Sequence, residues 1–140
     1  MLILLLLLIF GGVVPVAAAQ GVLLQAKNPA DWQPVAGGAT GQLSYDSERG
    51  TFCFSARGLA AQIEYALVRH TGNPRDGQVL AVGRSDGDGH LQLKGEWRLW
   101  SAKFWLLPVA DLKITGDRAE LKGWHPHRYL FESRQLGEDN

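Results

Sequence analysis

The sequence has 140 residues, with 14 basic and 14 acidic side chains and a formal net charge of zero at pH 7. A balanced surface offers no long-range attraction to the phosphates of nucleic acids or to anionic membrane surfaces, so partners of either kind have no support. The single cysteine, Cys53, excludes an intrachain disulfide, and a domain of this size can be stabilised by packing alone.

The N-terminal segment, residues 1–19, is uncharged and mostly apolar. An apolar run at 2–10 is followed by glycine and proline and then by three alanines at 17–19. This arrangement is typical of a secretory signal peptide, because signal peptidase cleaves after small residues. We therefore expect cleavage after Ala19, a single mature domain at 20–140, and a secreted or periplasmic protein.

The segment departs from the usual pattern because no basic residue precedes Lys27. An uncleaved membrane anchor is therefore an alternative: at about 1.5 Å per helical residue, 1–24 is long enough to cross roughly 30 Å of hydrocarbon. Pro15 and the pair Gly11 and Gly12 weaken such a helix. A membrane contact is expected only in this second case.

The rest of the chain alternates apolar and polar residues in short runs separated by turn residues, without a convincing helical stripe. This pattern predicts an all-β domain. The expected strands are residues 22–26, 42–45, 51–56, 63–70, 79–82, 90–97, 102–107, 112–114, 119–121 and 129–131. Short antiparallel strands without helical crossovers favour packed sheets, so we expect an antiparallel β-sandwich, immunoglobulin-like or jelly-roll-like, preceded by the N-terminal signal segment.

Two of these strands carry patterns that predict their surroundings. In 51–56, Phe52 and Phe54 share one face and Cys53 lies on the other. We nevertheless expect Cys53 to be buried, as free cysteines usually are. The nearly continuous apolar run 102–107 predicts a strand that is covered on both faces.

Several short stretches, most of them aromatic, are distributed over the chain. They are Asn28-Pro29-Ala30-Asp31-Trp32, Tyr65-Ala66-Leu67-Val68, Ser85-Asp86-Gly87-Asp88-Gly89, Lys103-Phe104-Trp105-Leu106-Leu107-Pro108, Gly123-Trp124-His125-Pro126 and Tyr129-Leu130-Phe131-Glu132. Together these stretches resemble small secreted all-β proteins of bacteria and archaea with a β-sandwich fold. No activity is established for that group, so the resemblance implies the fold and export but no catalytic residue.

The five tryptophans are many for one domain of this size. Trp97 and Trp105 lie in expected strands, where their rings add buried area to the core. Trp32, Trp100 and Trp124 lie in loops or at strand ends, where an exposed ring can stack on a sugar or on a similar apolar-faced ligand. These three are the candidate ligand-binding residues, and the alternative is that all five belong to the core.

Two histidines, His125 and His127, flank Pro126, so on an extended segment both imidazoles point to the same side. Such a pair begins a zinc or copper site if the fold adds further ligands. The candidates for these further ligands are His70, His90, Asp86 and Asp88. The alternative is that His125 and His127 are loop histidines beside a turn proline.

Asp86 and Asp88 alternate with glycine, which also suggests a calcium loop. Arg84 precedes them, however, and Gly95 stands near the position where a bidentate glutamate would be needed. A tight hairpin turn explains the same residues better.

No serine, cysteine or glutamate stands in a recognisable catalytic motif. The hypothesis that follows is an exported binding or structural module at the cell envelope or outside the cell, without a cofactor and with a glycan or a protein as partner. The alternative is a small metal-dependent or hydrolytic secreted enzyme that uses His125 and His127.

Overall fold

A computed structural model describes residues 20–73 and 75–137. The expected signal peptide, 1–19, lies outside the described residues, so cleavage after Ala19 stays a prediction. Within the described ranges, no helix combines the length and the apolar composition needed to cross a membrane.

The described part of the chain is built from ten β-strands and two short 3₁₀ turns. The strands are β1 (Gln20–Gln25), β2 (Thr40–Asp46), β3 (Thr51–Arg57), β4 (Glu64–His70), β5 (Gly77–Arg84), β6 (Leu91–Glu96), β7 (Lys103–Pro108), β8 (Leu112–Thr115), β9 (Arg118–Leu121) and β10 (Leu130–Glu132). The 3₁₀ turns are η1 (Val109–Asp111) and η2 (Pro126–Arg128). Every expected strand is present, and the ends differ by at most two residues, so the all-β prediction is confirmed.

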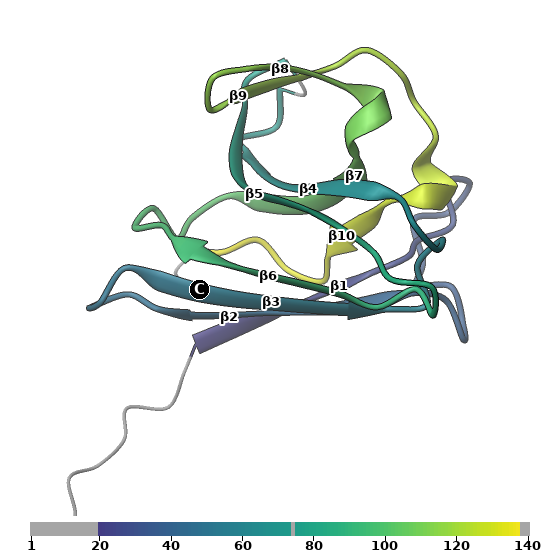
Figure 1. The fold of residues 1–140 in the computed structure, drawn as a ribbon, viewed down its shortest axis with the longest axis horizontal. Helices are drawn as coiled ribbons and strands as arrows, with labels where there is room; N and C mark the ends of the chain where they lie inside the picture. The colour runs from purple at the N-terminus through teal and green to yellow at the C-terminus, as the bar shows by residue number, and fades with distance from the viewer. Residues whose placement is uncertain (1–19, 74, 138–140) are drawn as a thin grey trace, which may run out of the picture.

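All ten strands belong to one sheet in the order β6-β3-β2-β1-β10-β7-β4-β5-β9-β8. Neighbouring strands are antiparallel throughout, as predicted. The sheet curls, so that the layer of β1, β2, β3 and β6 faces the layer of β4, β5, β7 and β10 (Figure 1). Because the β1–β10 pairing joins the two layers into one continuous sheet, the finer prediction of a sandwich of separate sheets is not confirmed.

The main core fills the space between the two layers, and strand β3 shows how the sequence builds it. Alternation places Phe52, Phe54 and Ala56 in this core. The same alternation points Cys53 outward, and this residue is exposed. The expected burial of Cys53 is therefore wrong, because β3 lies in a layer whose outer face meets solvent and period two carries every second side chain there.

A second, smaller core lies on the opposite face of β4, β7 and β10. Val68, Trp105 and Phe131 belong to it, and the β8–β9 hairpin covers them with Leu112 and Ala119. The hairpin lies above the layer of β4 and β7 in Figure 1. Strand β7 is buried on both faces, which confirms the prediction from the apolar run 102–107.

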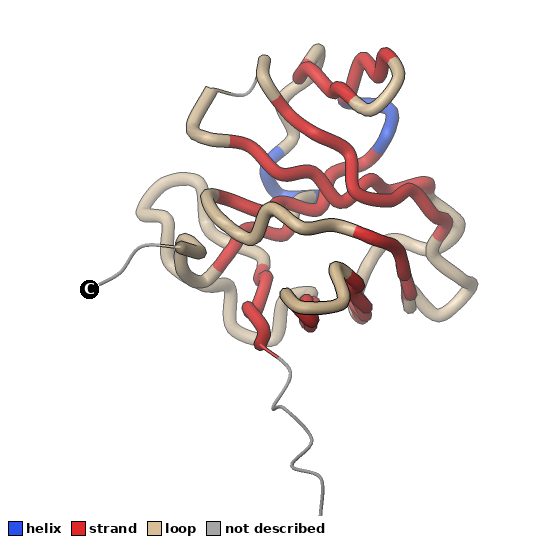
Figure 2. Tube along the Cα trace, turned by 90° about the vertical axis from the view of Figure 1, so that its left-hand side faces the viewer, coloured by secondary structure: helices blue, strands red, loops and turns tan. Residues whose placement is uncertain are grey.

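The segments that carry most of the candidate residues meet at one end of the curled sheet. The chain leaves β9, crosses the molecule and reaches η2 beside the loop between β1 and β2 (Figure 1). In the perpendicular view, both 3₁₀ turns lie in the upper part of the molecule, near the layer that contains β4 and β7 and not near the layer of β1, β2 and β3 (Figure 2). Loop residues far apart in sequence are thereby placed next to β10.

Candidate functional site

A run of aromatic rings crosses the outer face of β10 and β7 and reaches solvent at both ends. The ring centroid of Trp32 lies 4.5 Å from that of Phe131, which lies 4.8 Å from that of Trp105. Trp105 in turn lies 6.1 Å from Trp124, which meets Tyr129 edge to face at 5.5 Å. Trp32 is 40% exposed and Trp124 is 51% exposed, whereas the other three rings are buried. We call these five residues the aromatic surface, because the two exposed rings, Trp32 and Trp124, are supported by the three buried ones.

Local contacts hold the Trp32 ring in place. Trp32 has a left-handed backbone conformation, with φ of 61°, and its N–H donates to the carbonyl oxygen of Asn28 at 2.7 Å. Nζ of Lys27 lies 5.4 Å from the Trp32 ring centroid and donates to the carbonyl oxygen of Glu132 at 2.9 Å. The Trp32 ring is thus held beside β10 by its tilted contact with Phe131 and by the ammonium of Lys27.

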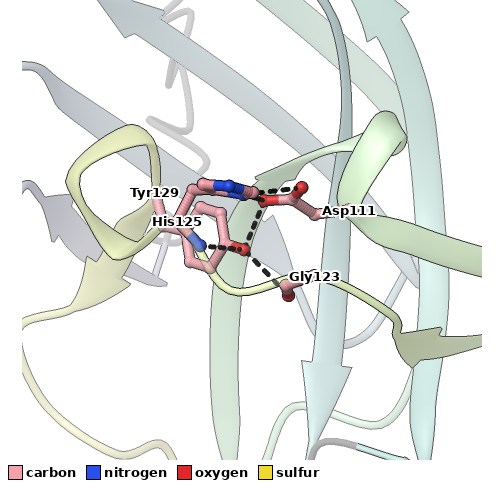
Figure 3. Close-up of polar contacts among 4 residues, drawn as sticks. All are labelled: Asp111, Gly123, His125 and Tyr129. Atoms are coloured by element: carbon pink, nitrogen blue, oxygen red, sulfur yellow. Dashed lines mark hydrogen bonds and ion pairs between the residues drawn. The ribbon is translucent and has the colours of Figure 1, made fainter.

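At the other end of the aromatic surface, a carboxylate, an imidazole and a phenol form one hydrogen-bonded group (Figure 3). Nδ1 of His125 lies 3.0 Å from both carboxylate oxygens of Asp111. The Tyr129 hydroxyl donates to Oδ2 of Asp111 at 2.5 Å and accepts the backbone N–H of His125 at 3.0 Å. An ionised carboxylate only accepts hydrogen bonds, so Nδ1 of His125 carries a proton, and in the neutral imidazole Nε2 is left as the acceptor.

The backbone brings Asp111 to this position from the end of η1, directly after β7. Its carbonyl oxygen accepts the N–H of Lys122 at 2.9 Å and that of Gly123 at 3.3 Å, which ties the end of β9 to η1. A Cβ at position 123 would lie 2.9 Å from Oδ1 of Asp111. A side chain at position 123 would crowd the Asp111 carboxylate, so this position favours glycine.

The electrostatics of this group follow from its burial. Burial alone would raise the pKa of the Asp111 carboxyl, but hydrogen bonds from Tyr129 and His125, with the charges of His125 and Arg128, bring that pKa below its ordinary value. Burial and the bond to Asp111 raise the pKa of the Tyr129 hydroxyl. At neutral pH the group is accordingly an ionised carboxylate with a neutral phenol.

The group combines a buried anchor with an accessible imidazole. The Asp111 side chain is 10% exposed, whereas the His125 side chain is 50% exposed. Because the carboxylate fixes the tautomer, Nε2 of His125 can accept a hydrogen bond from a ligand hydroxyl or take up a proton.

Of the three tryptophans expected at a ligand site, Trp100 does not join the aromatic surface. It stacks on Tyr45 at 4.2 Å and lies 5.7 Å from Phe104, both in the main core. Its indole thus offers its faces to the core rather than to a ligand, because the chain after β6 folds back over the interior. Trp32 and Trp124 remain as the half-exposed pair.

The residues expected to bind a metal lie in separate places. His127 is exposed, and its ring centroid lies 6.2 Å from that of His125 with the planes at 84°. His70 is buried beneath the β8–β9 hairpin, in contact with Trp105. Among residues 20–73 and 75–137, no group of three His, Cys, Asp or Glu side chains is placed to hold a metal ion, so the metal hypothesis gains no support.

Asp86 and Asp88 belong to the turn between β5 and β6. Oδ1 of Asp86 accepts the N–H groups of Asp88 and His90, each at 2.9 Å, and its Oδ2 lies 3.8 Å from Nδ1 of His90. The backbone bond from His90 is the largest of the effects that lower the pKa of the Asp86 carboxyl. The geometry is that of the hairpin turn, and Asp86 uses its oxygens to hold it.

Sequence reasoning missed Asp111 as a site residue. It stands alone between two short strands, and the partner His125 follows fourteen positions later, beyond the β8–β9 hairpin. No spacing rule links the two residues, because the hairpin that separates them folds back on itself. A single acidic residue between a proline and a strand was the only feature available in the sequence.

The sequence matches no known protein family, and no curated protein or solved structure is significantly similar to it.

Proposed function

We propose that this protein is an exported binding module that holds a glycan on the aromatic surface, at the cell envelope or outside the cell. Export is proposed from the apolar segment 1–19, and the two facing layers of the sheet serve as a β-sandwich-type scaffold. The observation that carries the proposal is the pair of half-exposed indoles, Trp32 and Trp124, in one packed run of rings.

A glycan needs two kinds of contact, and both are present at this surface. The C–H faces of sugar rings pack on aromatic rings, and the hydroxyls need hydrogen-bond partners. Nε2 of His125 accepts a hydroxyl hydrogen beside Trp124, and the ammonium of Lys27 donates beside Trp32. Since the buried rings beneath hold both indoles, little conformational freedom is lost on binding.

Removing either exposed indole tests the proposal. Trp32→Ala and Trp124→Ala are each expected to weaken glycan binding about tenfold or more, which corresponds to about 1.4 kcal/mol. The measurement is calorimetric titration with neutral hexasaccharides of glucose, N-acetylglucosamine, xylose and mannose. Leu99→Ala, which truncates an apolar side chain that is 49% exposed away from the aromatic surface, is the matched control and leaves affinity unchanged.

Two results would count against a glycan at this surface. One is binding of a hexasaccharide that neither tryptophan variant weakens. The other is no binding of any hexasaccharide in the set.

A hydrolytic enzyme is the second candidate, and the contact between Asp111 and His125 favours it. A carboxylate that holds the Nδ1 proton leaves Nε2 free to act as a general base. If the protein cleaves one of the hexasaccharides, the wild type releases reducing ends and His125→Gln stops the release. The variant still binds the hexasaccharide through Trp32 and Trp124, with the hydrogen bond to Nε2 of His125 lost. Binding without any release by the wild type supports the module instead.

A further inference from the structure

A cavity of about 400 Å³ opens at the end of the curled sheet where η2 meets the β1–β2 loop. Four segments enclose it: the β1–β2 loop, the loop after β3, the start of β4, and η2 with the residues leading into β10. Its lining contains neither Trp32 nor Trp124. We call this cavity the end pocket.

Most of the end pocket is apolar. Its exposed lining is provided mainly by carbon, and its apolar members include Val35, Ala39, Leu59 and Leu130. Tyr65 adds a buried phenol ring at the base. A volume of this size lies within the range of about 300–1,000 Å³ that is typical of pockets for small ligands.

The end pocket has basic side chains in its lining and no acidic ones. Lys27, His127 and Arg128 line it, and no aspartate or glutamate does. Lys27 is engaged with Glu132 and Trp32. Among the described residues, the guanidinium of Arg128 makes no hydrogen bond or ion pair. Burial raises the pKa of the Tyr65 phenol, and the charge of Arg128 acts in the opposite direction. Arg128 is therefore the cation of the end pocket whose charged group has no hydrogen-bond or ion-pair partner among the described residues.

We infer that the end pocket binds a small amphipathic anion, an apolar molecule with one carboxylate. The apolar lining takes the hydrocarbon part, and Arg128 forms a charge-assisted hydrogen bond with the carboxylate at the rim. A wholly apolar ligand would leave Arg128 unpaired beside it, and a polar sugar would leave its hydroxyls without partners along the apolar lining.

The test compares two probes of equal length, octanoate and 1-octanol, by calorimetric titration of the purified protein. Octanoate is expected to bind about tenfold more tightly than octanol. Arg128→Gln removes this preference by weakening octanoate about tenfold and leaving octanol unchanged. Lys94→Gln, which removes an exposed cation on β6 that does not line the end pocket, changes neither.

A second variant locates the bound probe. Ala60 lines the end pocket and is exposed, so a larger side chain at this position does not have to enter the core. The backbone carbonyl oxygen that accepts the hydrogen bond from Oγ of Ser85 at 2.6 Å is kept in the variant. Ala60→Trp fills the end pocket and is expected to abolish binding of both probes.

Equal affinity for octanoate and octanol, no binding of octanoate, or full binding by Ala60→Trp would each overturn the inference. The probes contain no sugar, and the variants leave Trp32 and Trp124 in place. Lys27 and Tyr129 line the end pocket and also belong to the glycan proposal, but none of the variants changes either residue. A failure of the octanoate test can therefore be distinguished from a failure of the glycan test, which depends on Trp32 and Trp124.

Discussion

Replacing Asp111 with alanine is expected to lower the free energy of unfolding by about 3 kcal/mol, because it removes the acceptor of a buried hydrogen-bonded group. The Tyr129 hydroxyl keeps only the Gly123 carbonyl oxygen, at 3.3 Å, as an acceptor. The imidazole of His125 loses the contact that fixes its orientation. Urea unfolding followed by tryptophan fluorescence measures the change.

Two further variants test whether the hydrogen bonds of Asp111, and not only the loss of a negative charge, cause this change in stability. Tyr129→Phe removes the hydrogen bond to Asp111 and the one that the hydroxyl accepts from the backbone N–H of His125, and is expected to cost about 2 kcal/mol, at about 1 kcal/mol for each bond. Asp88→Ala removes an exposed carboxylate whose side chain makes no hydrogen bond within the described residues, and is expected to change stability by less than about 0.5 kcal/mol. If Asp111→Ala were as mild as Asp88→Ala, the network would not stabilise the fold.

The contribution of Asp111 also has a defined pH range. The folded protein lowers the pKa of this carboxyl below the ordinary 3.8, so its stabilisation is complete above that value. It is lost only as the pH falls further, through the pKa of the folded state.

A second large effect is expected from His70 at mildly acidic pH. His70 is 4% exposed, and neither ring nitrogen has a hydrogen-bond partner within the described residues. Its ring meets Trp105 edge to face at 4.0 Å. Burial, together with the charges of Lys103 and Arg69, lowers the pKa of His70 from 6.5 to about 4.

The sign of the pH effect follows from this lowered pKa. Between pH 6.5 and about 4 the unfolded chain binds a proton at His70 and the folded protein does not, so stability falls as the pH falls through this range. The loss amounts to about 3 kcal/mol at the lower limit, at about 1.4 kcal/mol for each pKa unit. Urea unfolding at a series of pH values measures it.

His70→Leu is expected to remove most of this loss and to retain stability at pH 7, because an apolar side chain leaves no buried nitrogen without a partner. His127→Leu, which replaces an exposed histidine, serves as the control and keeps the wild-type pH dependence. An undiminished loss in His70→Leu would show that another group causes the acid sensitivity.

The strands were predictable because each carries its own pattern. In β3 the alternation of aromatic and small residues predicts the strand and puts Phe52 and Phe54 on one face, although the expected burial of Cys53 on the other face is wrong. In β7 the continuous apolar run predicts cover on both sides. What the local patterns do not contain is the order of strands. The pairing of β10 between β1 and β7 joins the two layers, and its β1 partner lies more than a hundred positions away in the chain.

The candidate site was predictable only in part, for the same reason. Their position in loops distinguished Trp32 and Trp124 from the core tryptophans. The same argument also selected Trp100, but the chain after β6 folds back and packs this ring against Tyr45. Asp111 contacts His125 because the β8–β9 hairpin between them brings the two residues together. No local pattern encodes such a contact, since it depends on where two chain segments end in space.

The most direct test of the glycan proposal is to follow the indole N–H resonances of the five tryptophans by NMR during titration with the hexasaccharides. Binding at the aromatic surface is expected to shift the resonances of Trp32 and Trp124, whereas that of Trp100, whose Nε1 is buried, stays in place. A hexasaccharide that leaves both Trp32 and Trp124 unchanged while shifting others would contradict the account, as would a set of titrations in which no indole resonance moves.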